Sequence, residues 1–196
     1  MEKNSITKIK KILIVICVLL IISLVSYVLI ANKVKEPTRE EIIENTDKYI
    51  THTSYDDKFT IETPNTWKIV VDKNSLNKNA ILELQNEEEN AYLVVVINSK
   101  LDLNEDFNTY KTKVFKQKET FYKTTITSYT DVVINERQAQ YGVIYYTNSN
   151  NINTYIRSYA FETENYYGQL VIWTLASNEE NVQKEFDNIV KTLKEK

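Results

Sequence analysis

An uncharged apolar segment of 20 residues, 12–31, constrains this chain more than any other feature of its sequence. The segment contains no proline, and only Cys17, Ser23, Ser26 and Tyr27 interrupt its aliphatic side chains. A helix of this length spans about 30 Å, which is the thickness of the hydrocarbon core of a bilayer. A core helix of a small soluble domain normally keeps a polar face. We therefore expect residues 12–31 to form a transmembrane helix in contact with the lipid bilayer.

The charges that flank this segment predict its orientation. Residues 1–11 carry four lysines and one glutamate, a net charge of +3, whereas residues 33–196 carry 20 cations and 26 anions. Short basic flanks stay in the cytoplasm. We therefore interpret residues 1–11 as a cytoplasmic basic tail. The chain is then a single-pass protein of the cell membrane with an extracytoplasmic C-terminal domain.

The apolar segment has the features of an uncleaved anchor. A signal peptide has an apolar core of about 7 to 15 residues and small residues at its exit. Here the core is longer, and the exit after Ala31 has the bulky Leu29 at its −3 position. Cys17 follows Ile16, whereas cleavage of a lipoprotein signal needs a small residue there. An uncleaved signal anchor is our interpretation, with cleavage after Ala31 as the alternative.

Composition excludes several functional classes. The two glycines, Gly142 and Gly168, are too few for a P-loop, a Rossmann fingerprint or a kinase glycine-rich loop. One histidine and one cysteine exclude a zinc site built from these residues. The net charge of −3 argues against nucleic acid as a partner. We expect no cofactor and no metal.

Residues 32–54 are predicted to be a juxtamembrane linker and helix. Thr38 and Glu41 have the spacing of a capping box, and a helix is expected over residues 39–49. Ile42, Ile43 and Ile50 would form its apolar stripe. The extracytoplasmic domain then occupies residues 55–196.

Alternating and short apolar runs predict that strands dominate this domain. Four strands are expected before a central helix and four after it, at residues 59–64, 67–71, 80–84 and 92–97, then 124–134, 138–147, 153–161 and 166–175. The run 92–97 is apolar on both faces, as in a central strand covered on both sides. Asn135 and Glu136 are expected to form a tight hairpin.

Two helices are predicted to cover this sheet. Asn104 is expected to cap the first of them, which carries an apolar stripe of Phe107, Tyr110, Val114 and Phe121. The second follows a capping box of Ser177 and Glu180. Its buried stripe is expected to comprise Val182, Phe186, Ile189, Val190 and Leu193. Because hairpin-length connections join the strands, the fold class is α+β with a central antiparallel sheet.

Short motifs in this domain resemble those of the PsbP-like family, named after an extrinsic subunit of photosystem II. Phe59, Ile61, Pro64 and Trp67 match its F-x-I-x-x-P-x-x-W opening. Further matches are residues 132–135 followed by Ala139, the aromatic strand 155–161 and the strand 166–175. The resemblance covers about residues 55–195. It departs at Glu136, where the family usually has glycine.

The resemblance implies an α/β/α sandwich around the antiparallel sheet. It also implies a bacterial, membrane-anchored extracytoplasmic branch of the family, most of whose members have no assigned activity. The role of the plant subunit in oxygen evolution does not transfer, because no metal-binding residues match. Pro64 and Trp67 are expected to act structurally, since proline ends a strand and tryptophan buries a large apolar area.

Two groups of side chains in the sequence resemble known catalytic or metal-binding patterns. His52 lies near Ser54 and Asp56, but a Ser-His-Asp site needs a strained nucleophile elbow, and no G-x-S-x-G is present. A surface or hinge histidine is the preferred interpretation. Residues 102–106 resemble the start of a calcium loop, but Phe107 stands where that loop needs glycine, and helix capping explains them better.

Two charged clusters remain. Residues 87–89 are three glutamates, interpreted as a solvated loop. A cluster of lysines could bind phosphate or an anionic wall polymer, or it could form the solvent-exposed face of an amphipathic helix. Its members are Lys111, Lys113, Lys116, Lys118 and Lys123.

A dense group of tyrosines is the candidate partner-binding surface, because tyrosine combines apolar area with a hydroxyl group. Its members are Tyr145, Tyr146, Tyr155, Tyr159, Tyr166 and Tyr167. The leading hypothesis is a binding or accessory module without catalysis that contacts an unknown protein of the cell envelope. The alternatives are a small-ligand receptor with a pocket between helix and sheet, and a carboxylate-dependent envelope hydrolase that uses Asp56 and Asp57.

The anchor makes a direct prediction. Because residues 12–31 match the bilayer thickness, extraction of the full chain from membranes should need detergent. Protease added outside intact cells should remove the C-terminal domain. Release by a carbonate wash, or complete protection from the protease, would contradict this topology.

Overall fold

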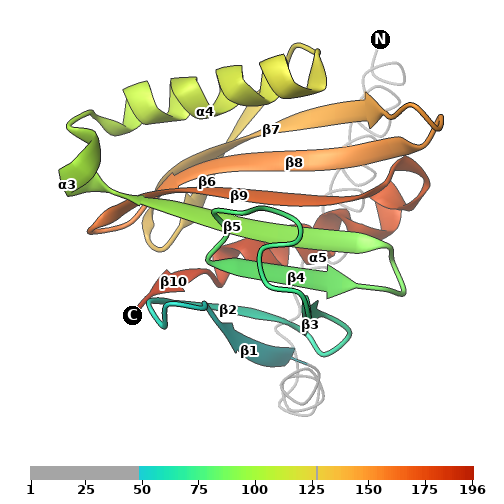
Figure 1. Ribbon diagram of the computed structural model, residues 1–196, viewed down its shortest axis with the longest axis horizontal. Helices are drawn as coiled ribbons and strands as arrows, with labels where there is room; N and C mark the ends of the chain where they lie inside the picture. The colour runs from blue at the N-terminus through green and yellow to red at the C-terminus, as the bar shows by residue number, and fades with distance from the viewer. Residues whose placement is uncertain (1–48, 127) are drawn as a thin grey trace, which may run out of the picture. The chain divides into compact units, whose positions relative to one another are not determined.

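The computed structural model describes residues 49–126 and 128–196 (Figure 1). The expected cytoplasmic tail, the expected anchor at 12–31 and the expected helix up to residue 48 lie outside the described residues. Within the described ranges, no helix is long and apolar enough to cross a membrane. The described residues belong to a single structural unit.

In the described part of the chain, the elements follow one another as strands, helices, strands, a helix and a short last strand. Before the central helix lie β1 (Tyr49–Thr53), β2 (Phe59–Pro64), β3 (Lys68–Ile69), β4 (Leu82–Asn86), β5 (Ala91–Ser99) and α3 (Lys100–Leu103). The central helix is α4 (Phe107–Tyr122). After it come β6 (Tyr129–Ile134), β7 (Arg137–Thr147), β8 (Asn153–Glu162), β9 (Tyr166–Leu175), the 3-10 turn η1 (Ala176–Asn178), α5 (Glu179–Lys191) and β10 (Lys194–Glu195).

Seven of the strands seen in these residues form one antiparallel sheet in the order β3-β4-β5-β9-β8-β7-β6. The hairpin between β6 and β7 turns at Asn135 and Glu136, as predicted, and both residues have positive φ angles of 51° and 62°. Two successive residues of positive φ match the right-handed twist of a two-residue hairpin. The mixed α+β class with an antiparallel sheet is confirmed.

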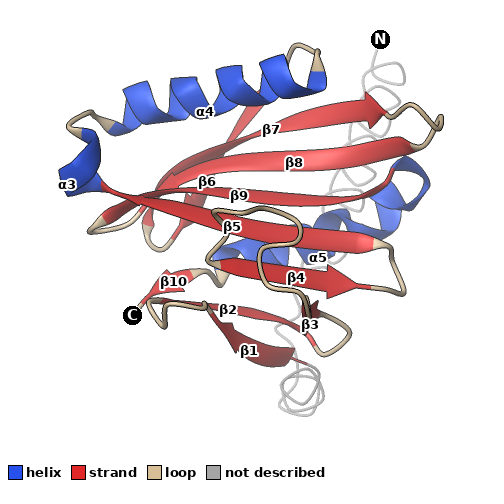
Figure 2. Ribbon diagram, in the orientation of Figure 1, coloured by secondary structure: helices blue, strands red, loops and turns tan. Residues whose placement is uncertain are grey.

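Each face of the sheet is covered by a helix (Figure 2). Side chains alternate between the faces of a strand, so Leu93 and Val95 of β5 point to the α5 side and Val94 points to the α4 side. All three are buried, which confirms that β5 is covered on both sides. On the α5 face, Phe186 and its helical neighbours complete the larger core cluster.

A second, small sheet closes the core on the α5 side. It has the order β1-β2-β10, and Phe59 and Ile61 of β2 are fully buried in the larger core cluster. Trp67 follows β2 and is also fully buried. Its ring packs edge-on against Phe186, with centroids 6.3 Å apart, and its Nε1 donates to Glu185 Oε1 at 2.7 Å. Trp67 therefore buries a large apolar area, and β2 ends at Pro64, as the sequence predicted for these two residues.

The predicted helix over 39–49 is wrong at its end. Tyr49 is the first residue of β1 and pairs with Pro64, so part of the expected linker belongs to the small sheet. Ile50, expected on the buried stripe of that helix, is 40% exposed in β1. β-branched residues at 50, 51 and 53 favour the strand once β2 is available as a partner.

The start and the stripe of α4 also differ from the prediction. Asn104 ends α3 with a left-handed φ of 44°, and Asp106 is the N-cap of α4, accepting from the Thr109 N–H at 2.8 Å. Phe115 takes the buried place that was expected for Phe121, which is 76% exposed. The buried stripe of α4 thus consists of Tyr110, Val114 and Phe115, and it does not reach the last turn of the helix.

The capping box expected before α5 is absent from the described residues. Ser177 lies in η1, where its hydroxyl bonds to the Asn178 side chain at 3.2 Å, and α5 starts at Glu179. The predicted stripe of α5 is confirmed. Its four members in α5 are buried, and so is Leu193, which lies two residues beyond the end of the helix; the four are Val182, Phe186, Ile189 and Val190.

Trp67→Ala should lower the free energy of unfolding by about 3 to 5 kcal/mol, because it leaves a cavity in the larger core cluster. The matched control is Val71→Ala, since Val71 is 92% exposed and should change the stability by less than about 0.5 kcal/mol. Urea denaturation of both variants, followed by circular dichroism, measures the two losses. Equal losses in the two variants would contradict the assignment of Trp67 to the core.

Candidate ligand-binding groove

A groove opens on the α4 side of the sheet because the two segments that cover this side do not meet. α4 packs on β7, β8 and β9, while the loop of residues 70–81 between β3 and β4 crosses the other part of the sheet (Figure 1). Side chains of β5 and β9 form the floor between them. We call this feature the α4 groove.

The α4 groove has two ends. Its apolar end has a volume of about 330 Å³ and is lined by Leu76, Asn77, Val94, Gln117, Lys118, Phe121, Tyr122, Val171 and Trp173. Its polar end has a volume of about 320 Å³ and is lined by Asn79, Val96, Asn98, Leu103, Glu105, Tyr110, Lys113, Val114, Gln117 and Gln169. Gln117 belongs to both ends, so the two volumes adjoin along the helix.

The loop wall is held down by a buried carboxylate. Glu83 of β4 is fully buried, and its Oε1 accepts from the backbone N–H groups of Leu76 at 2.9 Å and Asn77 at 2.7 Å. Its Oε2 has no hydrogen-bond partner among the described residues. Within the loop, the Asn74 side chain donates to the carbonyl of Lys78 at 2.8 Å. These bonds fix the backbone that forms one side of the groove.

The helix wall is the face of α4 that carries Gln117, Lys118, Phe121 and Tyr122. Residues three or four apart share one face of a helix, so this set lies along a single line of the groove. Val114, one turn earlier, is buried against the sheet and anchors the helix. The wall is therefore set by the same amphipathic pattern that packs α4.

The floor of the apolar end is aromatic. Trp173 of β9 stacks on Tyr92 of β5, with ring centroids 5.4 Å apart and an interplanar angle of 20°. The two residues are directly paired across the strands. Tyr122 packs against Tyr146 of β7 at 5.2 Å. The end thus offers flat apolar surfaces from both the sheet and the helix.

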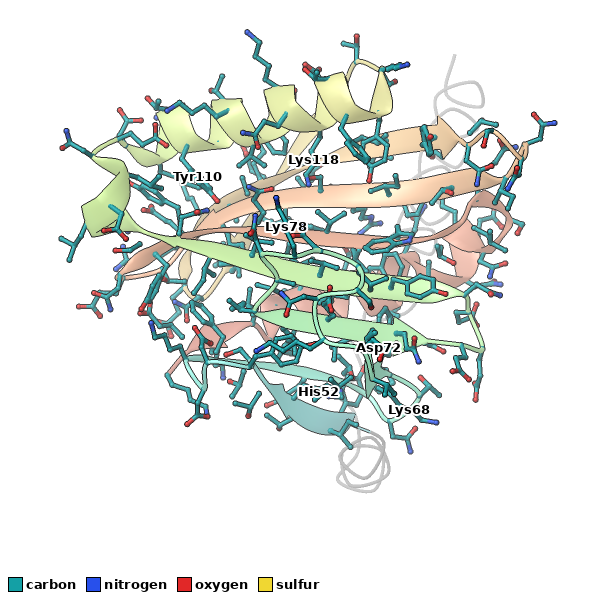
Figure 3. The ribbon with its side chains drawn as sticks, viewed as in Figure 1. His52, Lys68, Asp72, Lys78, Tyr110 and Lys118 are labelled. Atoms are coloured by element: carbon teal, nitrogen blue, oxygen red, sulfur yellow. The ribbon has the colours of Figure 1, made fainter. Side chains whose placement is uncertain are left out.

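Among the described residues that line the apolar end of the groove, Lys118 is the only charged one. Burial lowers the pKa of its ammonium group. Among the described residues no carboxylate lies within 4 Å of it, although Lys113 on the same helix pairs with Glu105. Figure 3 shows Lys118 between α4 and the sheet, and Lys78 on the loop below it in this view. A partly desolvated cation therefore faces an apolar recess.

The polar end is rich in neutral hydrogen-bonding groups. Asn98 of β5 donates to the hydroxyl of Tyr110 at 3.0 Å. Tyr110 belongs to α4, and its side chain is buried on the side of the helix that faces the sheet (Figure 3). Burial raises the pKa of Tyr110, so its hydroxyl stays protonated. The Lys113–Glu105 ion pair borders this end. These groups can orient a polar ligand by hydrogen bonds.

Three of the six tyrosines expected on a partner-binding surface lie in the core: Tyr155, Tyr159 and Tyr167, which are 7% exposed or less. Strand alternation explains this outcome. Tyr155 and Tyr159 point to the α5 side, whereas Tyr167 points to the α4 side and stacks on Tyr110 at 5.1 Å. The expectation of one shared tyrosine surface is corrected accordingly.

The other three tyrosines lie apart from one another in the packing. Tyr145 is 60% exposed and donates to Glu179 Oε1 at 2.8 Å; burial and then this hydrogen bond raise its pKa to about 12. Tyr146 is half-buried beside α4. Tyr166 packs edge-on against Phe59 at 5.6 Å. Of the predicted set, Tyr145 has the most accessible surface.

A buried arginine organises the α5 face of β8. Arg157 is 4% exposed; its Nε donates to the Tyr155 hydroxyl at 2.5 Å and its terminal nitrogen to Asp187 at 2.5 Å. The guanidinium also lies over the Tyr141 ring, 5.1 Å from its centroid. No pattern in the sequence marks Arg157 as buried, because a lone arginine in a strand gives no signal of burial. Its partners tie α5 to the sheet.

His52 is buried in β1, so the expected surface or hinge position is wrong. Its Nε2 lies 2.9 Å from the Thr63 hydroxyl, which itself donates to the Pro64 carbonyl. Because that hydroxyl has a single proton, Nε2 donates to it. Burial lowers the pKa of His52, which favours the neutral imidazole. Ser54 donates instead to Asp56 at 2.6 Å, so no Ser-His-Asp relay forms.

The other charged candidates do not converge on a site. In the described ranges, no three His, Cys, Asp or Glu side chains lie close enough to share a metal ion. Asp102 lies in α3, and Glu87 and Glu88 are exposed. Asp57 is exposed and pairs with Lys196, separately from Asp56.

The basic cluster divides between two environments. Lys113 and Lys116 are exposed, and Lys111 lies over the Phe107 ring at 5.7 Å. Lys118 alone among these lies at the apolar end of the groove. The sequence therefore indicated Lys118 only as one of a set, and it gave no prominence to Glu83 or Trp173. Their roles depend on which elements cover the sheet.

Glu83→Gln should loosen the loop wall, because hydrogen bonds to a charged acceptor are worth about 1.5 to 3 kcal/mol. The backbone N–H groups of Leu76 and Asn77 should exchange with solvent roughly tenfold to 100-fold faster. Hydrogen–deuterium exchange with mass spectrometry measures this change. Glu88→Gln is the control, since Glu88 is exposed. Unchanged exchange in Glu83→Gln would show that the carboxylate does not hold the loop.

The buried His52 predicts a pH effect on stability. Burial lowers its pKa from the usual 6.5, so the unfolded chain binds the proton more tightly than the folded chain. Stability should therefore fall as the pH is lowered through 6.5 toward the folded pKa, by at most about 1.4 kcal/mol per pH unit. Urea unfolding at pH 7.5 and pH 5.5 measures the loss. His52→Gln should show a smaller loss, and an equal loss would assign the effect to other groups.

Comparisons with known proteins show the fold of this domain. No protein-family model matches the chain, and no curated protein sequence matches it. Cyanobacterial PsbP (CyanoP) from Synechocystis sp. PCC 6803 is similar in structure, with a TM-score of 0.56 and 11% identity over 76% of this chain and 93% of that one. A protein from Bacteroides thetaiotaomicron VPI-5482 has a TM-score of 0.50 and 12% identity over 76% of this chain and 48% of that one. The described domain therefore has a PsbP-like fold.

Proposed function

We propose that this protein is a binding module without catalytic activity, held at the extracytoplasmic face of the cell membrane, and that the α4 groove is its ligand-binding site. Of the alternatives that the sequence left open, this is the small-ligand receptor with a pocket between helix and sheet. The groove is the observation that carries the proposal. Ligand sites in proteins are mostly apolar recesses with a few polar groups that fix orientation.

The two ends of the groove supply both components. Trp173 and Tyr122 provide apolar surface, and Lys118 provides a charge without a carboxylate partner among the described residues. At the other end, Asn98 and Gln169 provide amides. An apolar body with polar substituents would satisfy these groups together.

The other hypotheses are less well supported by the geometry. A carboxylate-dependent hydrolase needs paired acids with separated pKa values in a cleft. Asp56 and Asp57 are exposed and engaged with different partners, Ser54 and Lys196. Contact with an envelope protein through the tyrosines is restricted mainly to Tyr145.

Location at the membrane is supported by the sequence. The apolar segment 12–31 and the basic tail 1–11 predict a single-pass anchor with the domain outside the cytoplasm. The PsbP-like fold agrees with the family resemblance found in residues 55–195, and its membrane-anchored branch is the finer assignment that we propose. A module in this position could sample small molecules at the membrane surface.

A photoreactive amino acid placed in the full chain tests the site in its native membrane. Leu76 lies at the lip of the groove, whereas Val71 lies outside its lining and is 92% exposed. Irradiation should give a small-molecule adduct at position 76 and none at position 71, as measured by mass spectrometry of the digested protein. The photoreactive amino acid is also placed at position 145, where a crosslink would report contact of a partner with the surface around the exposed Tyr145.

The outcomes separate the hypotheses. A small adduct confined to position 76 supports the receptor. Crosslinks to protein from position 145, with no adduct at 76, would replace it with the protein-contact hypothesis. Equal labelling at 76 and 71 would show that the groove concentrates no ligand.

A further inference from the structure

We propose that the apolar end of the α4 groove binds a water-soluble small-molecule anion, whose carboxylate or phosphate group pairs with Lys118 and whose flat apolar body lies on Trp173. This inference names the ligand class and rests on the proposed function of the groove. Three observations carry it: the charge of Lys118, the amides beside it and the aromatic floor.

The ammonium of Lys118 is half-buried and has no compensating charge beside it among the described residues. Among the described residues, Lys113 pairs with Glu105 and Lys100 pairs with Glu162 at 3.0 Å, whereas Lys118 has no carboxylate within 4 Å. Removing a charge from water is unfavourable unless an opposite charge or hydrogen bonds replace the water. An anionic ligand supplies that opposite charge, while a cationic ligand would be repelled.

Two side-chain amides next to Lys118 can complete an anion site. The Asn77 Oδ1 accepts from the Asn79 N–H at 2.9 Å, which leaves its Nδ2 available as a donor. Neither this Nδ2 nor the Gln117 side chain forms a hydrogen bond with another described residue. Both line the apolar end with Lys118. An ammonium and two amide N–H donors match the several acceptor positions of a carboxylate or phosphate.

The body of the ligand is predicted from the floor. Trp173 is half-buried and is already stacked on Tyr92 on one side. Val94 and Val171 lie beside it and extend the apolar floor, and Tyr122 forms part of the wall. Aromatic side chains favour offset stacking with another ring. A planar, ring-bearing body fits this arrangement better than a flexible polar chain.

The size of the recess favours a small molecule over a lipid. A volume of about 330 Å³ is at the lower end of the range of ligand sites, roughly 300 to 1,000 Å³. It suits one ring-bearing body, whereas a membrane phospholipid has two acyl chains. We therefore assign the anion to a water-soluble molecule and treat a lipid headgroup as an outcome of the test.

Three probes with one ring and different charges test the ligand class. They are 4-(trifluoromethyl)benzoate, the corresponding neutral benzamide and the corresponding cationic benzylamine. Binding to the full chain in lipid nanodiscs is measured by ¹⁹F NMR line broadening, with empty nanodiscs subtracted. Benzoate should bind tenfold or more tightly than benzamide, and benzylamine should bind least.

Variants of α4 locate the charge. Lys118→Met should lower the affinity for benzoate tenfold or more, to the level of benzamide, and should leave benzamide binding unchanged. Lys118→Arg should keep the preference for benzoate over benzamide, which also controls for misfolding. Lys116→Met is the matched control, since Lys116 is exposed on the same helix and lies outside the apolar end. It should leave all three affinities unchanged.

The results distinguish this inference from the proposed function. Equal binding of the three probes, or no change in Lys118→Met, would overturn the anion assignment while the groove remains a binding site. No binding of any probe, together with no adduct at position 76, would overturn both. Displacement of benzoate by dihexanoyl phosphatidate at lower concentration than unlabelled benzoate would overturn the water-soluble source in favour of a lipid.

Discussion

The central strands of the sheet are apolar on both faces, and this constraint determines the rest of the domain. Leu93 and Val94 are neighbours in β5, yet they are buried on opposite sides. Each face therefore needs its own cover, because apolar surface left in water costs about 25 cal/mol per Å². The α5 side is covered by a helix and a second sheet, and its largest buried side chain is Trp67. The other side is covered by α4 and a loop.

Incomplete cover on the α4 side produces the groove. A helix of 16 residues packs on β7, β8 and β9, and the floor at β5 is left to a loop. Glu83 stabilises that loop by accepting two backbone hydrogen bonds from a buried position. The groove is thus bounded by one helix and by one loop, which the Glu83 carboxylate ties to β4 and the Asn74 side chain braces from within. Loops held in this way on a rigid sheet are common places for binding.

Three charged side chains show how differently burial can be compensated. Arg157 is buried with Asp187, Tyr155 and Tyr141 around it, so its charge is matched on several sides. Glu83 has backbone donors at one oxygen only. Lys118 is half-buried with no described carboxylate beside it. Because an unmatched charge in an apolar recess is costly, it is the feature in this domain that most favours an added partner.

The sequence by itself determined the local elements. Alternating and short apolar runs predicted β2, β5, β7, β8 and β9, and the pair Asn135–Glu136 predicted the hairpin. The spacing of Val182 to Val190 predicted the buried face of α5. Only the tertiary structure decided that residues 49–53 form a strand, since that strand depends on its pairing with β2. It also decided that three of the predicted tyrosines are core residues and that Lys118 faces Trp173 across a groove. The physical reason is that periodicity is a property of neighbouring residues, whereas the cover of each face depends on segments far apart in the chain.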